Sequence, residues 1–304
     1  MRPGTECALL KAVLWALGVL PAPVSVLAGK GLALAWYLLD GKHRRRILAD
    51  VERTPLASLP PREKKRMVRR MYLHYGVMLA ELAKFRKWPA EKVKACIDFA
   101  EGERLREAAE RGNALLVSAH FGNWELTGMC LPLYGVKMAV VARPLKNPCL
   151  DDLLNSIRTR FGQKTMKKFN VMREIIKSMR EGYSIGMLID QDAERDCVYV
   201  PFLGETAATL TVPAKLAVKY GMPVFCVVSY RERPFRHRYR ILGPIECPRE
   251  EADAVEKACR AFNDAISRAI LEHPEQWMWL HHRWRGADKK GLTRATAAEG
   301  KVSG

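Results

Sequence analysis

A histidine and a glutamate five residues apart, His120 and Glu125, are the residues of this sequence whose types and spacing best suit acid–base chemistry. An imidazole held at one nitrogen by a carboxylate can take a proton from a hydroxyl group with its other nitrogen. Within one helix the two side chains would point about 140° apart and could not easily meet. A corner between a strand and a helix would bring them together.

The residues around His120 predict such a corner. The apolar run ALLVSA, residues 114–119, is typical of a buried strand, and Gly122 and Asn123 supply a tight turn and a helix N-cap. His120 then lies at the carboxyl end of a strand, where open α/β sheets build their sites. We expect Glu125, in the first helical turn, to hold the imidazole. Taken alone, a histidine near a glutamate is more often structural.

A second predicted strand ends in Asp190 and Asp192, within the segment LIDQD. The functional interpretation is an acidic group that positions an arginine, because a metal pair would need further ligands. The alternative, without a functional role for these residues, is a solvated loop. Arg158 and Arg160 could reach the same edge of the sheet, where a guanidinium fork binds two phosphate oxygens at once. They also fit ordinary surface charges.

The segment GYSIG, residues 182–186, formally matches the nucleophile elbow of serine hydrolases. That elbow requires a strand before the serine and a helix after it. Here a helical pattern precedes Ser184 and a strand-like run follows it. Ser184 is therefore predicted to be an ordinary strand residue.

Helical and strand-like segments alternate along most of the chain, which predicts an α/β domain over residues 46–286. Short, continuous apolar runs indicate strands buried on both faces of one central, mostly parallel sheet flanked by helices. The helical segments include residues 67–85, 147–158 and 170–182, and Asn147 and Asn170 serve as N-caps; the strand-like segments include residues 137–143, 184–190 and 223–230.

Residues 1–45 are apolar and are predicted to anchor the protein to a membrane, as two short helices in one leaflet or as one tilted span. The alternative is a buried helical hairpin. Residues 41–70 hold eleven Lys and Arg against three Asp and Glu. Basic residues beside an apolar anchor favour the anionic cytoplasmic leaflet, so we expect the domain at the cytoplasmic face of the inner membrane.

The overall charge of +18, from 51 Lys and Arg against 33 Asp and Glu, suggests an anionic partner. The interpretation of the chain as a nucleic-acid-binding protein rests on this charge alone, since no zinc-finger, RRM or KH signature is present. The eight cysteines are scattered and are predicted to be reduced, with no zinc or disulfide framework. Residues 287–304 are predicted to be a disordered tail.

Six segments of this chain, taken together, resemble the lipid A biosynthesis acyltransferases, the late lauroyl and myristoyl transferases of the lysophospholipid acyltransferase superfamily. The likeness spans about Leu9 to Arg285. The segments are HFGNWE (120–125), VARPLKNPCLDDLL (141–154), IRTR (157–160), LIDQD (188–192), VPFLGETAATLTVPAKLA (200–217) and PEQWMWLHHRWR (274–285). In the last segment, Trp277 and Trp279 are interpreted as core or interfacial aromatics rather than substrate contacts.

The resemblance implies a glycerolipid-acyltransferase-like fold. It also implies acyl transfer from acyl carrier protein, or less often acyl-CoA, to a 3-hydroxyacyl hydroxyl of a Kdo-bearing lipid A precursor. It assigns His120 as the catalytic base and Glu125 as its partner. Arg158 and Asp190 match the other two functional positions, with Arg160 as the nearby alternative to Arg158. The family uses no metal or cofactor and forms no covalent acyl-enzyme.

Two other functions remain open at this point. The same chemistry could act on another glycolipid, such as a phosphatidylinositol mannoside, or on a lysophospholipid, because the HFGNWE segment does not discriminate among acceptors. A non-catalytic membrane-binding protein would keep the basic anchor without needing His120 and Glu125.

Overall fold

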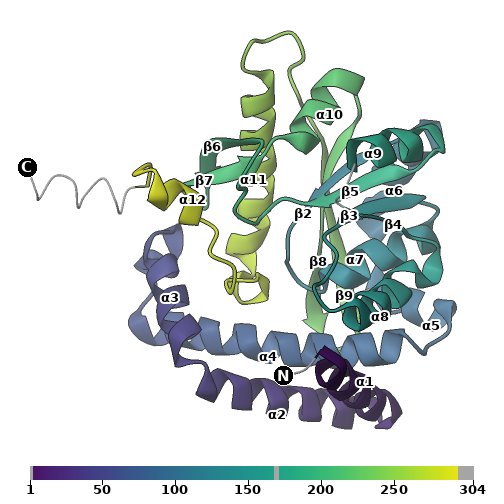
Figure 1. Cartoon of the computed structure of the whole chain (residues 1–304), viewed down its shortest axis with the longest axis vertical. Helices are drawn as coiled ribbons and strands as arrows, with labels where there is room; N and C mark the ends of the chain where they lie inside the picture. The colour runs from purple at the N-terminus through teal and green to yellow at the C-terminus, as the bar shows by residue number, and fades with distance from the viewer. Residues whose placement is uncertain (1–2, 168–170, 294–304) are drawn as a thin grey trace, which may run out of the picture.

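The computed structural model describes residues 3–167 and 171–293, and its centre is a seven-stranded sheet (Figure 1). The strand order is β1-β9-β8-β2-β5-β3-β4, and all neighbours are parallel except β8 and β9. The predicted mostly parallel sheet is confirmed. The strands are β1 (Ile97–Asp98), β2 (Leu115–Ser118), β3 (Met138–Ala142), β4 (Lys164–Lys167), β5 (Ser184–Leu188), β8 (Val224–Arg233) and β9 (Arg236–Ile245).

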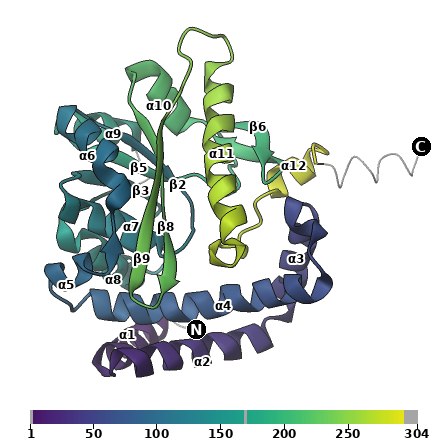
Figure 2. The same ribbon diagram turned by 180° about the vertical axis from the view of Figure 1, so that it is seen from behind.

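Helices cover both faces of this sheet (Figures 1 and 2). In β2, Leu115 and Val117 pack in one core and Leu116 in the other, as the alternation of side chains along a strand requires. The first core contains residues of α9 (Val171–Arg180), α10 (Val212–Tyr220) and α11 (Ala254–Glu272); the second contains residues of α6 (Glu103–Arg111), α7 (Trp124–Cys130) and α8 (Pro148–Arg158). Burial on both sides explains why the central strands read as continuous apolar runs.

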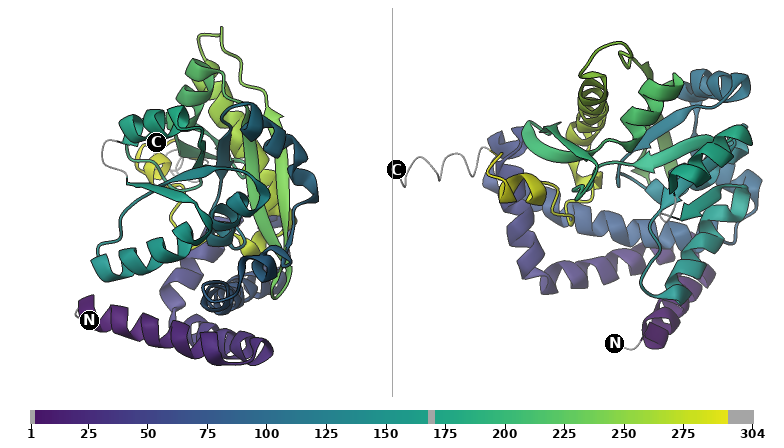
Figure 3. Two further views of the ribbon diagram at one scale, coloured as in Figure 1. Left: turned by 90° about the vertical axis from the view of Figure 1, so that its right-hand side faces the viewer. Right: turned by 45° about the horizontal axis from the view of Figure 1, so that its top comes forward.

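The N-terminal helices lie together at one end of the molecule (Figures 1 and 3). They are α1 (Pro3–Val19), α2 (Ala22–Leu39), α3 (Gly41–Glu52) and α4 (Pro61–Phe85). By length and composition α2 could cross a membrane, and 22% of its residues are buried. Many large apolar side chains of α1 and α2 are exposed instead, among them Leu9, Trp15, Leu27, Leu38 and Leu39.

Two strands outside the main sheet, β6 (Cys197–Phe202) and β7 (Glu205–Leu210), form an antiparallel hairpin that the sequence patterns did not predict. Its turn residues Leu203 and Gly204 both have positive φ, as type I′ hairpin turns require.

The remaining elements are short: α5 (Ala90–Lys94), α12 (Arg285–Lys289), and the 3-10 helices η1 (Pro55–Ser58), η2 (Ala100–Gly102), η3 (Leu131–Tyr134), η4 (Thr159–Phe161) and η5 (Pro274–Gln276).

Two predicted helix caps are confirmed. The side chain of Asn123 accepts a hydrogen bond from the Leu126 amide at the start of α7. Asn147 likewise accepts one from Cys149 at the start of α8. The third predicted cap, Asn170, lies outside the described residues.

The predicted tail begins too early. Residues 285–289 form α12, and the side chain of Ala287 is fully buried. Thr293 is also buried and donates a hydrogen bond to Asp288. Packing against the main domain therefore extends to Thr293, because Asp288 also pairs with Arg53.

The prediction that all cysteines are reduced differs from the structure, which joins Cys7 of α1 to Cys149 of α8 in a disulfide. The two Cα atoms are 6.0 Å apart, within the usual span of such a bond. The cysteines are separated by 142 positions, so only the packing of α1 on α8 could reveal the pairing.

Helix α2 crosses α4 at a contact between two glycines. A Cβ added to Gly29 would lie 2.2 Å from the carbonyl oxygen of Gly76, and one added to Gly76 would lie equally close to Gly29. Only glycine permits this approach of two backbones. A Cβ added to Gly31, on the exposed side of the same helix, would have no other residue's atom within 4 Å.

We therefore expect Gly29→Ala and Gly31→Ala to have opposite effects. Gly29→Ala should destabilise the protein by about 1–3 kcal/mol through overpacking. Gly31→Ala should be neutral or stabilise it by up to about 1 kcal/mol, because alanine favours helix. Thermal unfolding of both variants in detergent measures the difference. Equal stability of the two variants would contradict the tight α2–α4 contact.

Candidate active site

His120 and Asp190 meet at the carboxyl ends of two adjacent parallel strands. Ser118 of β2 pairs with Leu188 of β5, so the residues two positions further along each strand lie side by side. His120 Nδ1 lies 2.9 Å from Asp190 Oδ1, and the His120 amide donates to Asp190 Oδ2 at 2.9 Å. Trp277 Nε1 donates to the same Oδ2 at 2.8 Å. The carboxylate is thus fixed from three directions.

The Asp190 carboxylate decides which nitrogen of His120 carries the proton. Burial by itself raises the pKa of Asp190, but the charge of His120 and hydrogen bonds from His120 and Trp277 outweigh it and lower that pKa. An ionised carboxylate only accepts, so Nδ1 donates and Nε2 keeps its lone pair. The His120 side chain is 18% exposed against 2% for Asp190, so the imidazole is the accessible member of the pair. The amide nitrogen of Gln191 lies 3.4 Å from His120 Nε2.

Glu125 does not hold the imidazole, which corrects the expected pairing. Its carboxylate accepts two hydrogen bonds from Arg158, from Nε and Nη2, each at 2.6 Å. Burial by itself lowers the pKa of Arg158, whereas the hydrogen bonds and charge of Glu125 raise it. The helix begins at Trp124, and its first turn directs Glu125 toward α8 instead of back toward β2.

The structure separates the two candidate arginines. Arg158 binds Glu125, whereas Arg160 donates from Nη1 to the Phe85 carbonyl at 2.7 Å and from Nη2 to the Trp88 carbonyl at 2.6 Å. Phe85 is the last residue of α4, where helical carbonyls lack partners within the helix, and Trp88 lies in the turn that follows. Arg160 therefore caps α4 and is not part of the group around His120.

The turn between His120 and α7 is held by the backbone of neighbouring segments. Gly122 has φ +59°, and a Cβ there would lie 1.5 Å from the Ser229 carbonyl oxygen. The Gly122 amide donates to the Gln276 carbonyl, and the Met278 amide donates to the His120 carbonyl, each at 2.9 Å. The segments HFGNWE and PEQWMWLHHRWR thus lie against each other, although they are far apart in the sequence.

A series of aromatic rings leads from helix α2 to His120. The ring centroids of Trp36 and Tyr75 lie 6.0 Å apart, those of Tyr75 and Trp124 6.1 Å, and those of Trp124 and His120 5.3 Å. Trp36 is 40% exposed on α2, and Tyr75 belongs to α4. The site therefore has an apolar side that begins at the exposed surface of α2.

Sequence patterns missed two residues that hold the segment around Asp190. Trp277 was expected to be a core aromatic, and it is buried, but its indole nitrogen also anchors the carboxylate. Arg283 is fully buried and donates to the Gln191 carbonyl at 3.2 Å and to Thr209 Oγ1 at 2.8 Å. Burial lowers the pKa of Arg283 to about 10. The sequence offered a single signal for these two residues: an arginine or an indole, if buried, must donate its N–H groups to acceptors.

The other two sequence candidates have partners other than His120. Ser184 is buried at the first position of β5, directly after α9. It is therefore a strand residue, as predicted, and not the serine of a nucleophile elbow. Asp192 accepts from the Gly286 amide at 3.1 Å and pairs with Arg285 at 3.7 Å. Within residues 3–167 and 171–293, no three His, Cys, Asp or Glu side chains are grouped to hold a metal ion.

The lowered pKa of Asp190 predicts a specific loss of stability in acid. Its contribution is fully present above its ordinary value of 3.8 and disappears as the pH falls through the lower folded-state value. Wild type should therefore lose more unfolding free energy below about pH 4 than Asp190→Asn does. Denaturant unfolding between pH 3 and pH 6 measures this, with Asp192→Asn as control. If Asp190→Asn follows the wild-type acid dependence, the Asp190 carboxylate is not stabilised by His120 and Trp277.

Comparison with known proteins finds acyltransferases over most of the chain. Residues 5–286 match the family model described as bacterial lipid A biosynthesis acyltransferase. The lipid A biosynthesis lauroyltransferase of Escherichia coli (strain K12) is 31% identical over 284 residues, covering 90% of this chain and 89% of the relative. The lipid A biosynthesis palmitoleoyltransferase of the same strain is 26% identical over 277 residues, with the same coverage.

A more distant relative has a different acceptor in its name. The phosphatidylinositol mannoside acyltransferase of Mycobacterium tuberculosis (strain H37Rv) is 26% identical over 181 residues, covering 56% of this chain and 54% of the relative. All three relatives are acyltransferases, and the family match covers nearly the whole α/β domain together with the N-terminal helices. The chain therefore belongs to the bacterial lipid A biosynthesis acyltransferase family.

Proposed function

We propose that this acyltransferase moves a fatty acyl group from a thioester of acyl carrier protein or coenzyme A to a 3-hydroxyacyl hydroxyl of a Kdo-bearing lipid A precursor. The reaction takes place at the cytoplasmic face of the inner membrane. The observation that carries the proposal is the His120–Asp190 pair: a partly exposed imidazole held at Nδ1 by a buried carboxylate, so that Nε2, which lies 3.4 Å from the Gln191 amide nitrogen, keeps its lone pair to take a proton. That is the arrangement a hydroxyl-activating base requires.

In the proposed reaction, His120 Nε2 takes the proton from the acceptor hydroxyl as its oxygen attacks the thioester carbonyl. The Asp190 carboxylate, bound to Nδ1 at 2.9 Å, stabilises the imidazolium that forms. When the tetrahedral intermediate collapses, the carbon–sulfur bond breaks and the imidazolium gives its proton to the departing thiolate. One ester forms and one thioester is lost, so charge and protons balance without a covalent acyl-enzyme.

We assign Arg158 a role in substrate binding, with Glu125 as the residue that fixes it. The fork uses Nε and Nη2 for Glu125, so Nη1 remains to bind an oxygen of the substrate. A guanidinium held by a bidentate ion pair loses little further side-chain freedom when substrate arrives. Glu125 then contributes to catalysis through Arg158, and His120 depends on Asp190.

The membrane assignment rests on the N-terminal helices. Leu27 is 71% and Leu39 87% exposed, which is unusual for large apolar side chains in water. The aromatic series from Trp36 to Trp124 places apolar side chains between α2 and His120, which supports an approach of the acyl chains from this side. The chain's charge of +18 would attract an acidic carrier protein and anionic lipid.

An acyl-transfer assay tests the proposal. Purified protein is incubated with Kdo-bearing lipid IVA and a panel of acyl-ACP and acyl-CoA donors, and the masses of the products are measured by mass spectrometry. One added acyl chain is expected. His120→Ala should lower the rate by about 100-fold or more. The matched control His43→Ala changes a partly exposed histidine that pairs with Asp40 on α3, and it should keep the wild-type rate.

Each other outcome has a definite meaning. An active His120→Ala variant would exclude His120 as the base. Transfer to a phosphatidylinositol mannoside or a lysophospholipid, with none to the lipid A precursor, would replace the proposed acceptor. Membrane binding without transfer from any donor would favour the non-catalytic alternative.

The two arginines give a second comparison. Arg158→Lys keeps the charge but loses the two-pronged contact with Glu125, so kcat/KM should fall by about 10-fold or more. Arg160→Lys loses a cap on α4, so it should lower Tm and leave kcat/KM near wild type. Steady-state kinetics and thermal unfolding of both variants measure these effects. The opposite pattern would show that Arg160, and not Arg158, binds substrate.

A further inference from the structure

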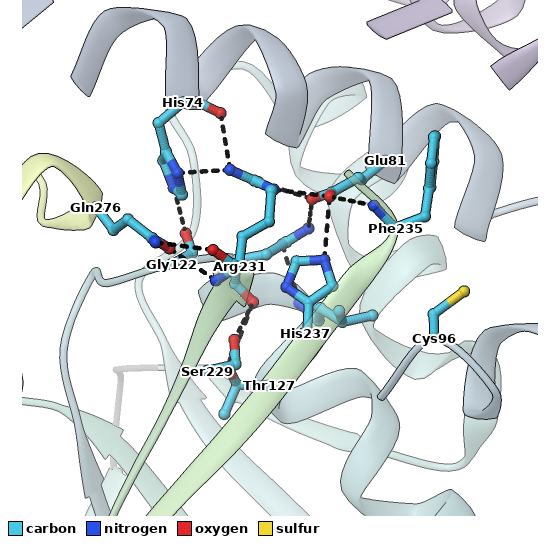
Figure 4. Close-up of polar contacts among 12 residues, drawn as sticks. His74, Glu81, Cys96, Gly122, Thr127, Ser229, Arg231, Phe235, His237 and Gln276 are labelled. Atoms are coloured by element: carbon cyan, nitrogen blue, oxygen red, sulfur yellow. Dashed lines mark hydrogen bonds and ion pairs between the residues drawn. The ribbon is translucent and has the colours of Figure 1, made fainter. Parts of the chain in front are cut away.

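A buried polar group that takes no direct part in the proposed reaction lies behind the turn that carries His120 (Figure 4). We call it the Glu81 cluster and define it as His74 and Glu81 of α4, Arg231 of β8, His237 of β9 and Gln276 of η5. Glu81 and His237 are fully buried, and the other three are at most 9% exposed. So many buried polar groups are costly unless they are fully paired.

Glu81 is the acceptor at the centre of this cluster. Arg231 donates to it from Nε and Nη2, each at 2.7 Å, and the Phe235 amide donates at 3.1 Å. His237 Nε2 also lies 3.1 Å away. Burial by itself raises the pKa of Glu81, but the charges of Arg231 and His237 outweigh it and hold that pKa well below its ordinary range. The carboxylate therefore stays ionised and only accepts.

This carboxylate fixes the orientation of Asn123, the N-cap of α7. Asn123 Nδ2 donates to Glu81 Oε2 at 3.0 Å, so the amide must turn its oxygen the other way. That oxygen accepts the Leu126 amide at 3.2 Å and begins the helix that carries Glu125. Glu81 thus determines which end of Asn123 meets the helix.

The rest of the cluster fixes Gly122 on both sides. Arg231 Nη1 donates to His74 Nδ1, because a guanidinium cannot accept. His74 is therefore protonated at Nε2, which donates to the Gly122 carbonyl at 3.0 Å. Gln276 exchanges two hydrogen bonds with the Arg231 backbone, at 2.8 and 3.0 Å, and its own carbonyl accepts from the Gly122 amide.

We propose that Glu81, through its ion pair with Arg231, is a positioning residue for acyl transfer that sets the geometry of the turn from His120 to Glu125. The inference rests on the proposed function. A buried ion pair gives little net stability compared with well-packed apolar residues of similar size. What it supplies here, directly and through His74 and Gln276, is a fixed partner for three groups of the turn: the Gly122 backbone amide, the Gly122 carbonyl and the side-chain amide of Asn123.

Two variants test this role. Glu81→Gln removes the charge and replaces one of the two accepting oxygens with an NH2 group that donates, so the donors from Arg231, Asn123 and Phe235 are left with a single acceptor. Asn123→Ser keeps an oxygen that can cap α7 but cannot reach Glu81, so it leaves the ion pair with Arg231 intact. Each should lower kcat by about 10- to 100-fold, because small misplacements of a catalytic group cost that much, while KM for donor and acceptor changes by less than about threefold. Asn123→Ser keeps the test valid if Glu81→Gln does not fold.

The matched control is Asn113→Ala. Asn113 donates to the carbonyls of Met179 and Tyr183 at the opposite, amino edge of the sheet, at 3.0 and 2.8 Å. Its loss should lower Tm without changing kcat. A purely structural role of Glu81 would instead make the three variants alike, with Tm lowered and kcat near wild type.

Hydrogen exchange separates this inference from the proposed function. Amide exchange in residues 120–127, followed by mass spectrometry, needs no substrate. It should be about tenfold faster or more in both test variants and unchanged in Asn113→Ala. Unchanged exchange, or wild-type kcat in folded Asn123→Ser, overturns the positioning role. A wild-type protein that transfers no acyl group defeats the proposed function, while the exchange result still decides the role of Glu81.

Discussion

The hydrogen bond between His120 and Asp190 depends on two parallel strands that end at the same level. Ser118 pairs with Leu188, so the chain leaves β2 and β5 side by side and presents one side chain from each, two residues later. The buried position of Asp190 requires several donors, and the His120 ring, its own amide and the Trp277 indole supply them. The register of two strands therefore fixes both the tautomer and the direction of the imidazole.

The turn after His120 divides the site into two ion-paired parts. On one side, His120 contacts Asp190; on the other, Glu125 contacts Arg158 of α8. Gly122 makes the sharp turn between the two parts possible. Its φ is positive, and any side chain there would collide with the Ser229 carbonyl. The turn has few internal hydrogen bonds, so its shape depends on partners from α4, β8 and η5.

Helix α4 connects the N-terminal helices, with their exposed apolar side chains, to this turn. One side of it packs against α2 at the contact of Gly29 with Gly76, and its residue His74 bonds the Gly122 carbonyl. Tyr75 of the same helix lies between Trp36 and Trp124 in the aromatic series. The turn that carries His120 and the helix that carries the exposed apolar side chains thus both pack against α4, which would suit the proposed reaction on lipid substrates.

The sequence alone determined the parts whose signals are local. Apolar runs buried on both faces marked the central strands, Asn123 and Asn147 marked helix starts, and the HFGNWE segment marked the corner of the site. Tertiary structure alone decided that Asp190, and not Glu125, meets His120, because that depends on β5 lying beside β2 with its end level. Contacts between neighbouring strands and helices leave no periodic pattern in a single chain. The sequence therefore identified the candidate carboxylates but not the side chain that each one contacts.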